Sequence, residues 1–140
     1  MDAAHRGRLF PFTRSILTAL RHRGIKIAII TRNCGAAVRH VFPDMDLYCQ
    51  GFLAREDVPK VKPDPDHLLR ALSKVVATPE AALMVGDHPI DIKTGLGAGV
   101  LTAGVSSGNA TREDLSKSGA RWIAGNCEEL ISVLAEQQFI

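Results

Sequence analysis

The sequence predicts an α/β fold in which helices cover both faces of a mostly parallel sheet. Its strand-like runs are apolar throughout, as in strands that are buried on both faces. These runs alternate along the chain with segments of helical periodicity. Because 140 residues with 46% hydrophobic side chains suit one domain with a sizeable core, we expect residues 1–140 to form a single domain.

The first predicted elements are a helix and a buried strand. The stretch "SILTALRHRG" has apolar residues at Ile16, Leu17 and Leu20 and ends in Gly24, which is typical of a helix with a glycine stop. The next run, "IKIAII", is apolar and β-branched up to Thr31. Such a run predicts a buried strand.

The middle of the chain contains the clearest helical pattern. A short helix is expected near "CGAAVRHVF", and a weaker strand around "LYCQGF". The segment "PDPDHLLRALSKVV" predicts a longer helix, because aspartates suited to capping precede residues that share one apolar face. That face is expected to comprise Leu68, Leu69, Leu72, Val75 and Val76.

The C-terminal half continues the alternation. The run "AALMV" predicts a second buried strand, "IDIKTGLGA" a helix opened by Pro89, and "VLTAGV" a third strand. A Thr-x-x-Asp start predicts a helix at "TREDLSKSG", and "RWIA" predicts a brief strand. In "NCEELISVLAEQQF", Asn126 and Glu129 predict the start of a capped last helix.

The composition argues against several classes of protein. Seventeen basic and fifteen acidic side chains give a formal charge of +2, too small for the broad basic surface of a nucleic-acid-binding protein. No apolar run approaches the roughly 20 residues of a membrane span, so we expect a cytoplasmic protein without membrane or nucleic-acid partners. The three scattered cysteines fit free thiols better than a disulfide framework or a zinc site.

Polar residues gather where the predicted strands end. Thr31 ends one strand, Asp87 ends another, and Lys62 lies in the loop that leads into a helix. Ligands of open α/β sheets bind at the carboxyl ends of the strands, so we expect these three side chains to converge. Asp91 follows Asp87 by about one helical turn. Taken alone, these two aspartates would be more typical of helix capping than of a functional site.

Three segments at these strand ends form an ordered series. They are "IAIITRN", "VKPDPDHLLRAL" and "LMVGDHPIDIKTGLGAG". The series resembles motifs two, three and four of the haloacid dehalogenase-like (HAD) phosphohydrolase superfamily over about residues 11–135, and it is most similar to the phosphoglycolate phosphatase-like branch. The resemblance implies a HAD-like (Rossmannoid) three-layer sandwich that acts as a phosphatase on a small phosphorylated metabolite.

The resemblance also implies which residues would bind the phosphate. Thr31 would donate a hydrogen bond to it, and Arg32 and Asn33 would contribute where the next helix begins. Lys62 would offset the charge of the phosphate and the carboxylates together. Such a set suits phosphoryl transfer, because negative charge concentrates on the nonbridging oxygens.

By the same resemblance, Asp87 and Asp91 would form the metal site, with Mg²⁺ as the cofactor. Asp87 would bind the ion directly, and Asp91 would support its waters or orient Lys62. Oxygen ligands and retained waters are what Mg²⁺ prefers. The catalytic residues implied are therefore Thr31, Lys62, Asp87 and Asp91.

The family's nucleophile motif is not recognisable in this sequence. In the family, an Asp-x-Asp motif ends the first strand, precedes a cap insertion and forms an aspartyl-phosphate. Here Asp2 follows no apolar run, and Asp44 and Asp46 precede their apolar run instead of following one. We therefore expect a core without its first strand and cap, through truncation, a wrongly assigned start or true loss. Such a chain would be inactive alone and could pair with a missing N-terminal segment or with itself.

Two alternatives remain open from the sequence. One is a non-catalytic module that retains the site for binding an anion, a metal or a partner. The other is a receiver-like signalling domain, which also uses Asp, Thr and Lys at strand ends, although their order along this chain is wrong for it. His88, beside Asp87, is more typical of a structural histidine than of a ligand.

Overall fold

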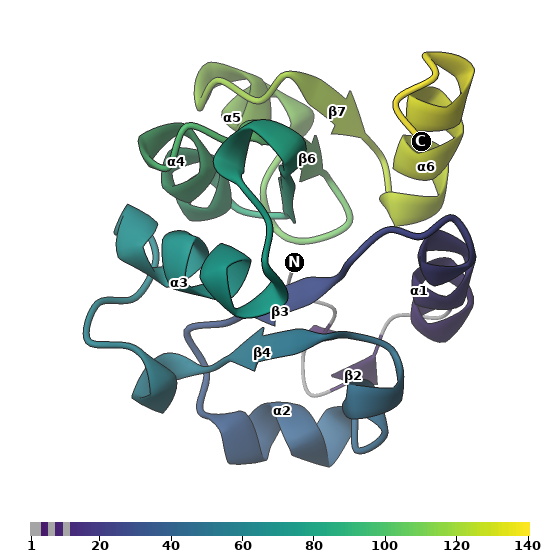
Figure 1. The fold of residues 1–140 in the computed structure, drawn as a ribbon. Coiled ribbons are helices and arrows are strands. Elements are labelled where there is room, and N and C mark those ends of the chain that lie inside the picture. Colours follow the sequence, from purple (N-terminus) through teal and green to yellow (C-terminus); the bar gives the residue numbers. More distant parts are fainter. Residues whose placement is uncertain (1–3, 6–7, 10–11) are drawn as a thin grey trace.

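The computed structural model describes residues 4–5, 8–9 and 12–140 and has an α/β architecture (Figure 1). Short 3₁₀ helices, η1 (Met45–Leu47), η2 (Arg55–Asp57) and η3 (Pro79–Ala81), lie between the main elements. In chain order, those elements are β1 (Ala4–His5), β2 (Arg8–Leu9), α1 (Thr13–His22), β3 (Ala28–Ile30), α2 (Gly35–Val41), β4 (Gly51–Leu53), α3 (Pro65–Val75), β5 (Leu83–Gly86), α4 (Pro89–Gly97), β6 (Leu101–Val105), α5 (Arg112–Lys117), β7 (Trp122–Ala124) and α6 (Cys127–Glu136).

The parallel strands form two hydrogen-bonded groups. β3 pairs with β4, with Ile29 opposite Phe52, and β5, β6 and β7 pair in that order, with Val85 opposite Ala103. Among the described strands, none pairs with both β3 and β5. The prediction of parallel strands is confirmed. The strands form two hydrogen-bonded groups instead of one continuous sheet, since no hydrogen-bonded ladder joins β3 to β5.

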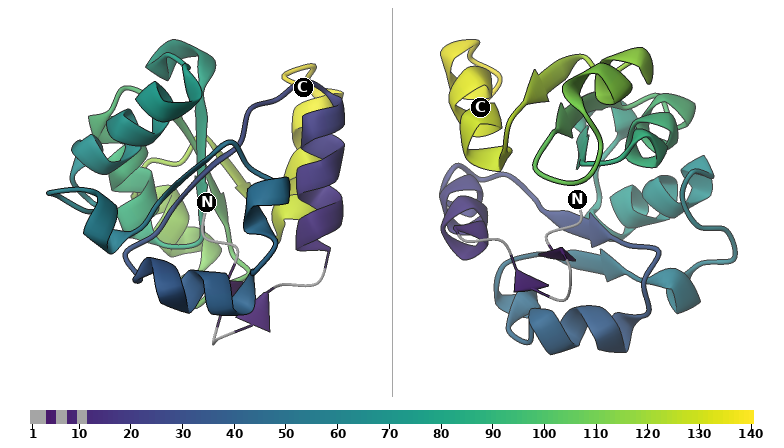
Figure 2. Two further views of the ribbon diagram at one scale, coloured as in Figure 1. Left: turned by 60° about the horizontal axis from the view of Figure 1, so that its bottom comes forward. Right: turned by 180° about the vertical axis from the view of Figure 1, so that it is seen from behind.

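Helices cover both sides of the strands. In Figure 2, α3 and α4 lie on one side, and α1 and α6 lie side by side on the other. One buried cluster joins the two strand groups, because Ile30 of β3 and Met84 of β5 both pack with α3, through Leu68 and Leu72. The layered α/β architecture is therefore confirmed, and α3 holds β3 and β5 in fixed positions.

Hydrogen bonds at the caps confirm the predicted helix starts. The Asp64 carboxylate accepts from the backbone N–H of Asp66 (2.9 Å) where α3 begins. Asn126 accepts from the backbone N–H of Glu129 (2.8 Å) where α6 begins. Pro89 is the first residue of α4, a position that needs no N–H donor.

Three details differ from the sequence prediction. In α3, Leu69 is 41% exposed, and Val76 lies beyond the helix at 80% exposure with a φ of 57°. His67, which was not predicted in the core, is fully buried. The strand expected around "LYCQGF" begins only at Gly51, because η1 and the turn after it occupy the preceding residues.

Neither a membrane-spanning helix nor a disulfide is found in the described part of the chain. No described helix combines the length and the apolar character needed to cross a bilayer. Cys34, Cys49 and Cys127 are all thiols, as expected. Burial raises the pKa of both Cys49 and Cys127, which disfavours their thiolate forms.

Candidate functional site

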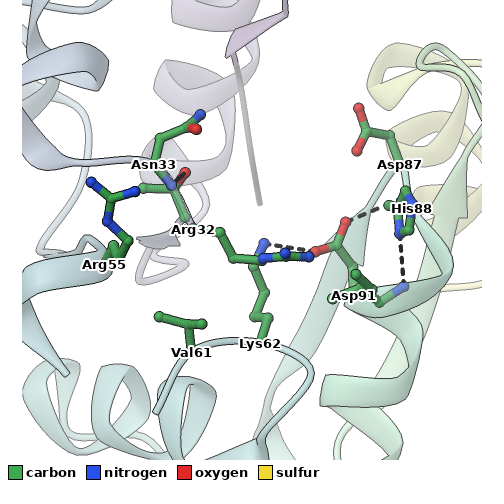
Figure 3. Close-up of a pocket in the computed structure, with 10 residues that line it drawn as sticks. Arg32, Asn33, Arg55, Val61, Lys62, Asp87, His88 and Asp91 are labelled. Atoms are coloured by element: carbon green, nitrogen blue, oxygen red, sulfur yellow. Dashed lines mark hydrogen bonds and ion pairs between the residues drawn. The ribbon is translucent and has the colours of Figure 1, made fainter. Parts of the chain in front are cut away.

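A pocket of about 510 Å³ lies beyond the carboxyl ends of β3, β4 and β5 (Figure 3). This volume is within the usual range for small-molecule sites. The expected convergence is confirmed, because the pocket is lined by every residue predicted for the site, namely Thr31, Arg32, Asn33, Lys62, Asp87 and Asp91. Arg55, Val61, His88 and Ile90 also line it.

Thr31 is fixed at the end of β3. Its backbone N–H continues the β3–β4 ladder by donating to the carbonyl oxygen of Leu53 (3.2 Å), and its side chain is buried. Its Oγ1 accepts from the backbone N–H of Asn33 (3.1 Å). Because a hydroxyl can accept and donate at once, Thr31 can still donate to a ligand in the pocket.

Lys62 and Asp91 form a buried ion pair in the pocket wall. Lys62 Nζ lies 2.7 Å from Asp91 Oδ1, and each side chain is 5% exposed. Figure 3 shows this pair between Asp87 on one side and Asn33 and Arg55 on the other. Two charges removed from water need this partnership, since either one left alone would be strongly destabilised.

The second carboxylate oxygen of Asp91 caps the start of α4. Asp91 Oδ2 accepts from the backbone N–H of His88 (3.2 Å), while His88 Nδ1 accepts from the backbone N–H of Ile90 (3.1 Å). His88 is thus the N-cap of the helix, as the structural interpretation of this residue expected. Asp91 caps the same helix and also holds Lys62.

Glycines make room for both aspartates. A Cβ atom on Gly86 would lie 2.1 Å from Cβ of Asp91, so a side chain at this position would collide with the ion pair. A Cβ atom on Gly108, in the loop after β6, would lie 2.6 Å from Oδ2 of Asp87. The close approach of backbone to carboxylate explains why these two positions need glycine.

Arg55 is the charged pocket residue that the sequence analysis missed. It lies two residues after the end of β4, at the start of η2, and its backbone N–H donates to the carbonyl oxygen of Asn33 (3.1 Å). Its side chain is exposed and reaches the pocket from the side of Asn33 (Figure 3). Its position after the strand predicted around "LYCQGF" was an indication of a site residue, but Arg55 belongs to none of the recognised motifs.

Two of the aspartates considered as nucleophiles, Asp44 and Asp46, are not part of the pocket. Asp44 pairs with Arg14 (2.7 Å), and Asp46 pairs with Arg39 (3.0 Å) on the surface. The hydrogen bond from Arg14 lowers the pKa of Asp44. Asp2 lies outside the described residues.

The donor set suits a weakly held hard cation. Asp87 and Asp91 supply carboxylate oxygens, the ligands that Mg²⁺ prefers, and the pocket leaves room for waters. Within the described residues, no group of three or more His, Cys, Asp or Glu side chains could enclose a metal. These residues therefore fit an ion that keeps most of its waters.

Comparison with known families agrees with this geometry. Residues 2–105 match the family model described as haloacid dehalogenase-like hydrolase, and the matched region includes every predicted site residue. The chain belongs to this family. Its α/β architecture with parallel strands is the HAD-like fold, and the phosphohydrolase resemblance of the three motifs is confirmed at the level of the family.

Several relatives bear the name pyrophosphatase. PpaX of Anoxybacillus flavithermus is 31% identical over 121 residues, 82% of this chain and 54% of the relative. PpaX of Bacillus cereus is 39% identical over 89 residues, 62% of this chain and 41% of the relative. The chain spans about half the length of the curated relatives that it matches.

A solved structure extends the similarity of fold. The crystal structure of a hydrolase from Pseudomonas syringae superposes with a TM-score of 0.84 at 24% identity. The superposition covers 92% of this chain and 63% of that chain. At this identity, the similarity concerns the fold alone.

Proposed function

We propose that this chain provides the phosphate-binding and metal-binding part of a phosphohydrolase for small phosphorylated compounds. The observation that supports this most is the convergence of a hydroxyl, an ammonium and two carboxylates in one pocket. Phosphoryl transfer is catalysed by positioning and by stabilising charge on the phosphoryl oxygens, and these are the groups that do so. Because relatives are named pyrophosphatase, inorganic pyrophosphate is a substrate to test beside phosphate monoesters.

Three residues would hold the phosphoryl group from the β3 side. The Thr31 hydroxyl would donate to one oxygen, and Asn33 and Arg32 would donate to others from the loop that follows. Lys62 would add a fixed positive charge. Its burial at 5% exposure supports this role, since an ammonium held in place by Asp91 needs little reorganisation to meet the substrate.

Asp87 would bind Mg²⁺ from the β5 side. When bound, the ion would neutralise charge on the phosphoryl oxygens. Both oxygens of Asp91 already accept hydrogen bonds, from Lys62 and from the backbone N–H of His88. This engagement supports an orienting role for Asp91, with contact to the metal through water.

The proposed reaction follows the family's covalent route and requires one further carboxylate. A carboxylate oxygen would form a bond to phosphorus as the bond between phosphorus and the leaving oxygen breaks, and a protonated acid would give its proton to that oxygen. Water would then attack phosphorus and pass a proton to the now deprotonated acid, while the bond between phosphorus and the carboxylate oxygen breaks, which releases phosphate and regenerates both groups. Asp44 and Asp46 do not line the pocket, so another aspartate would have to enter it.

The place for that aspartate is suggested by the strand pairing. Within the described residues, β3 has a ladder only with β4, and β5 only with β6. Thr31 and Asp87, at the ends of β3 and β5, line the same pocket. We propose that an apolar parallel strand ending in Asp-x-Asp pairs between β3 and β5, supplied by an N-terminal segment or by a separate chain.

The test uses the 140-residue chain and a synthetic peptide. The peptide has about five β-branched apolar residues, a strand's usual length, followed by Asp-x-Asp. With Mg²⁺ and either pyrophosphate or an aryl phosphate, we expect no turnover from the chain alone and measurable turnover after the peptide is added. Without a nucleophile, a loss of a thousandfold or more is expected, equivalent to about 4 kcal/mol of barrier.

Matched controls distinguish the outcomes. A peptide ending in Asn-x-Asn should give no turnover, and Lys62→Ala and Asp87→Asn should each abolish the activity made by the active peptide. Equal turnover with and without the peptide, lost in Asp87→Asn, would contradict the need for a further carboxylate. Binding of inorganic phosphate without turnover under any condition would instead favour a non-catalytic anion-binding module.

A further inference from the structure

His67 does not line the pocket, but it contacts the backbone of the pocket residue Lys62 and the backbone of Leu53. Its side chain is fully buried. Its Nδ1 accepts from the backbone N–H of Lys62 (3.2 Å), and its Nε2 lies 3.0 Å from the carbonyl oxygen of Leu53. Because a carbonyl oxygen can only accept, the ring hydrogen is assigned to Nε2, and the neutral ring uses both nitrogens.

The carbonyl oxygen of Leu53 has a second donor. It also accepts from the backbone N–H of Thr31 at 3.2 Å. The His67 ring therefore connects the strand end that presents Thr31 with the loop that presents Lys62. Both of these residues line the pocket, so the ring fixes their backbones relative to each other.

We propose that His67 is a positioning residue that holds the backbone of Lys62, so that the ammonium meets Asp91 and a bound phosphate. The last step rests on the function proposed above. Lys62 is held at both ends, by His67 at its backbone N–H and by Asp91 at its Nζ (2.7 Å). A long flexible side chain loses little entropy on binding when both ends are already fixed.

The competing explanation is that His67 only fills space in the core. A filler residue is needed for its shape, whereas a positioning residue is needed for one particular hydrogen bond. Two substitutions separate these requirements. In His67→Asn, Oδ1 takes the place of Nδ1 and can accept from Lys62, whereas in His67→Gln, the amide nitrogen takes the place of Nε2 and can donate to Leu53.

The two variants differ in the group that they leave without a partner. His67→Gln leaves the buried N–H of Lys62 without an acceptor, and an unsatisfied buried donor is costly. In His67→Asn, the carbonyl oxygen of Leu53 keeps its hydrogen bond from Thr31. The proposal therefore predicts that His67→Asn preserves the Lys62 position and His67→Gln does not.

The experiment measures Lys62 directly in the 140-residue chain. Nitrogen-15 NMR of lysine ammonium groups should show a slowly exchanging Lys62 signal, identified by its absence in Lys62→Met. We expect this signal in wild type and in His67→Asn, but not in His67→Gln. Titration with inorganic phosphate and Mg²⁺ should give an affinity about tenfold lower for His67→Gln than for His67→Asn, which corresponds to about 1.4 kcal/mol of binding free energy.

Each outcome bears on one claim. Equal Lys62 signals and equal phosphate affinities in the two variants would overturn the positioning role, even if both variants lose stability. A wild-type chain that does not bind phosphate but shows the expected Lys62 signals would count against the proposed function and leave the positioning of Lys62 supported. If neither variant folds, the ring nitrogen shifts of wild-type His67 decide, and a hydrogen on Nδ1 would overturn the proposal.

Discussion

Lys62 Nζ lies 2.7 Å from Asp91 Oδ1, and this ion pair connects the loop before α3 to the first turn of α4. α4 follows β5, whereas the Lys62 loop follows β4, so the pair spans the two strand groups. Both charges are buried. The pair therefore contributes to the folded state as well as to the chemistry proposed for the pocket.

We expect removal of either charge to be strongly destabilising. Lys62→Met leaves a buried carboxylate and Asp91→Asn a buried ammonium, and each should lower the free energy of unfolding by about 3–5 kcal/mol. The double variant should cost less than the sum of the two single variants, because it leaves no unpaired charge. Urea unfolding at neutral pH measures all three.

An exposed pair provides the control for this comparison. Lys117 and Glu113 lie 3.1 Å apart with side chains 74% and 75% exposed. Lys117→Met should change stability by no more than about 0.5 kcal/mol. An equally small effect of Lys62→Met on stability would contradict the structural importance inferred for the buried ion pair. So would a double variant whose loss of stability equals the sum of the losses in the two single variants.

Gly86 and Gly97 offer a matched pair of glycine substitutions. Gly86→Ala should displace Asp91 and lower the free energy of unfolding by more than about 2 kcal/mol, because the new Cβ atom would lie 2.1 Å from Cβ of Asp91. A Cβ atom on Gly97 in α4 would lie 3.5 Å from Pro65, an ordinary contact. Gly97→Ala should therefore be neutral or slightly stabilising. Thermal unfolding measures the stability of both variants. Equal changes in stability would contradict the collision inferred at Gly86.

The strand ends and the polar residues that follow them were predictable from the sequence. Apolar runs that stop at Thr31 and Gly86 mark where parallel strands end, and ligands gather at that edge. Asp64 and Pro89 likewise mark helix starts by rules that need no tertiary contacts. The pocket therefore follows from local patterns combined with one rule of topology.

His67 and Arg55 were not predictable in the same way. A histidine in an apolar helical stretch gives no sign of being buried. His67 can be buried because its ring is hydrogen-bonded to the carbonyl oxygen of Leu53, at the end of a strand, and to the backbone N–H of Lys62, in a loop. Neither partner can be recognised from the helical pattern. Arg55 is placed at the pocket by a tertiary contact, the hydrogen bond from its backbone N–H to the carbonyl oxygen of Asn33 (3.1 Å). Both residues depend on tertiary contacts that periodicity does not encode.

Stability should fall on mild acidification because of His67. Burial lowers the pKa of His67 below its ordinary 6.5, and the nearby charge of Lys62 lowers it further, although the hydrogen bond to Leu53 and the charge of Asp66 oppose this. The unfolded chain then binds the proton more readily than the folded chain. The contribution of neutral His67 to the free energy of unfolding is complete above about pH 6.5 and is lost as the pH falls toward the lower pKa of the folded state.

Comparison with His67→Asn isolates this contribution. Free energies of unfolding measured between about pH 7 and pH 5 should decline by up to about 1.4 kcal/mol per pH unit more in wild type than in the variant. The other histidines remain in both chains and serve as an internal control. Parallel pH profiles for the two proteins would show that His67 is not held neutral by the fold.

Arg55 should favour substrates that carry a second phosphoryl group. Its guanidinium enters the pocket from the side of Asn33, away from Asp87 (Figure 3), and it can bind phosphate through two parallel hydrogen bonds. We expect Arg55→Ala to weaken pyrophosphate binding about fivefold and orthophosphate binding less, as measured by calorimetry with Mg²⁺. Arg55→Lys should recover only part of the difference. An equal loss for both anions would assign Arg55 a general electrostatic effect.

Mg²⁺ should bind weakly to the described residues alone. Asp87 and Asp91 are the carboxylates that line the pocket, and Asp91 already accepts from Lys62 and from the backbone N–H of His88. A site with so few protein ligands should have a dissociation constant in the millimolar range, which corresponds to about 4 kcal/mol. Calorimetry should show this binding abolished in Asp87→Ala and unchanged in Asp46→Ala, whose carboxylate lies on the surface beside Arg39. Micromolar binding that survives Asp87→Ala would place the metal elsewhere, and the role proposed for Asp87 would be wrong.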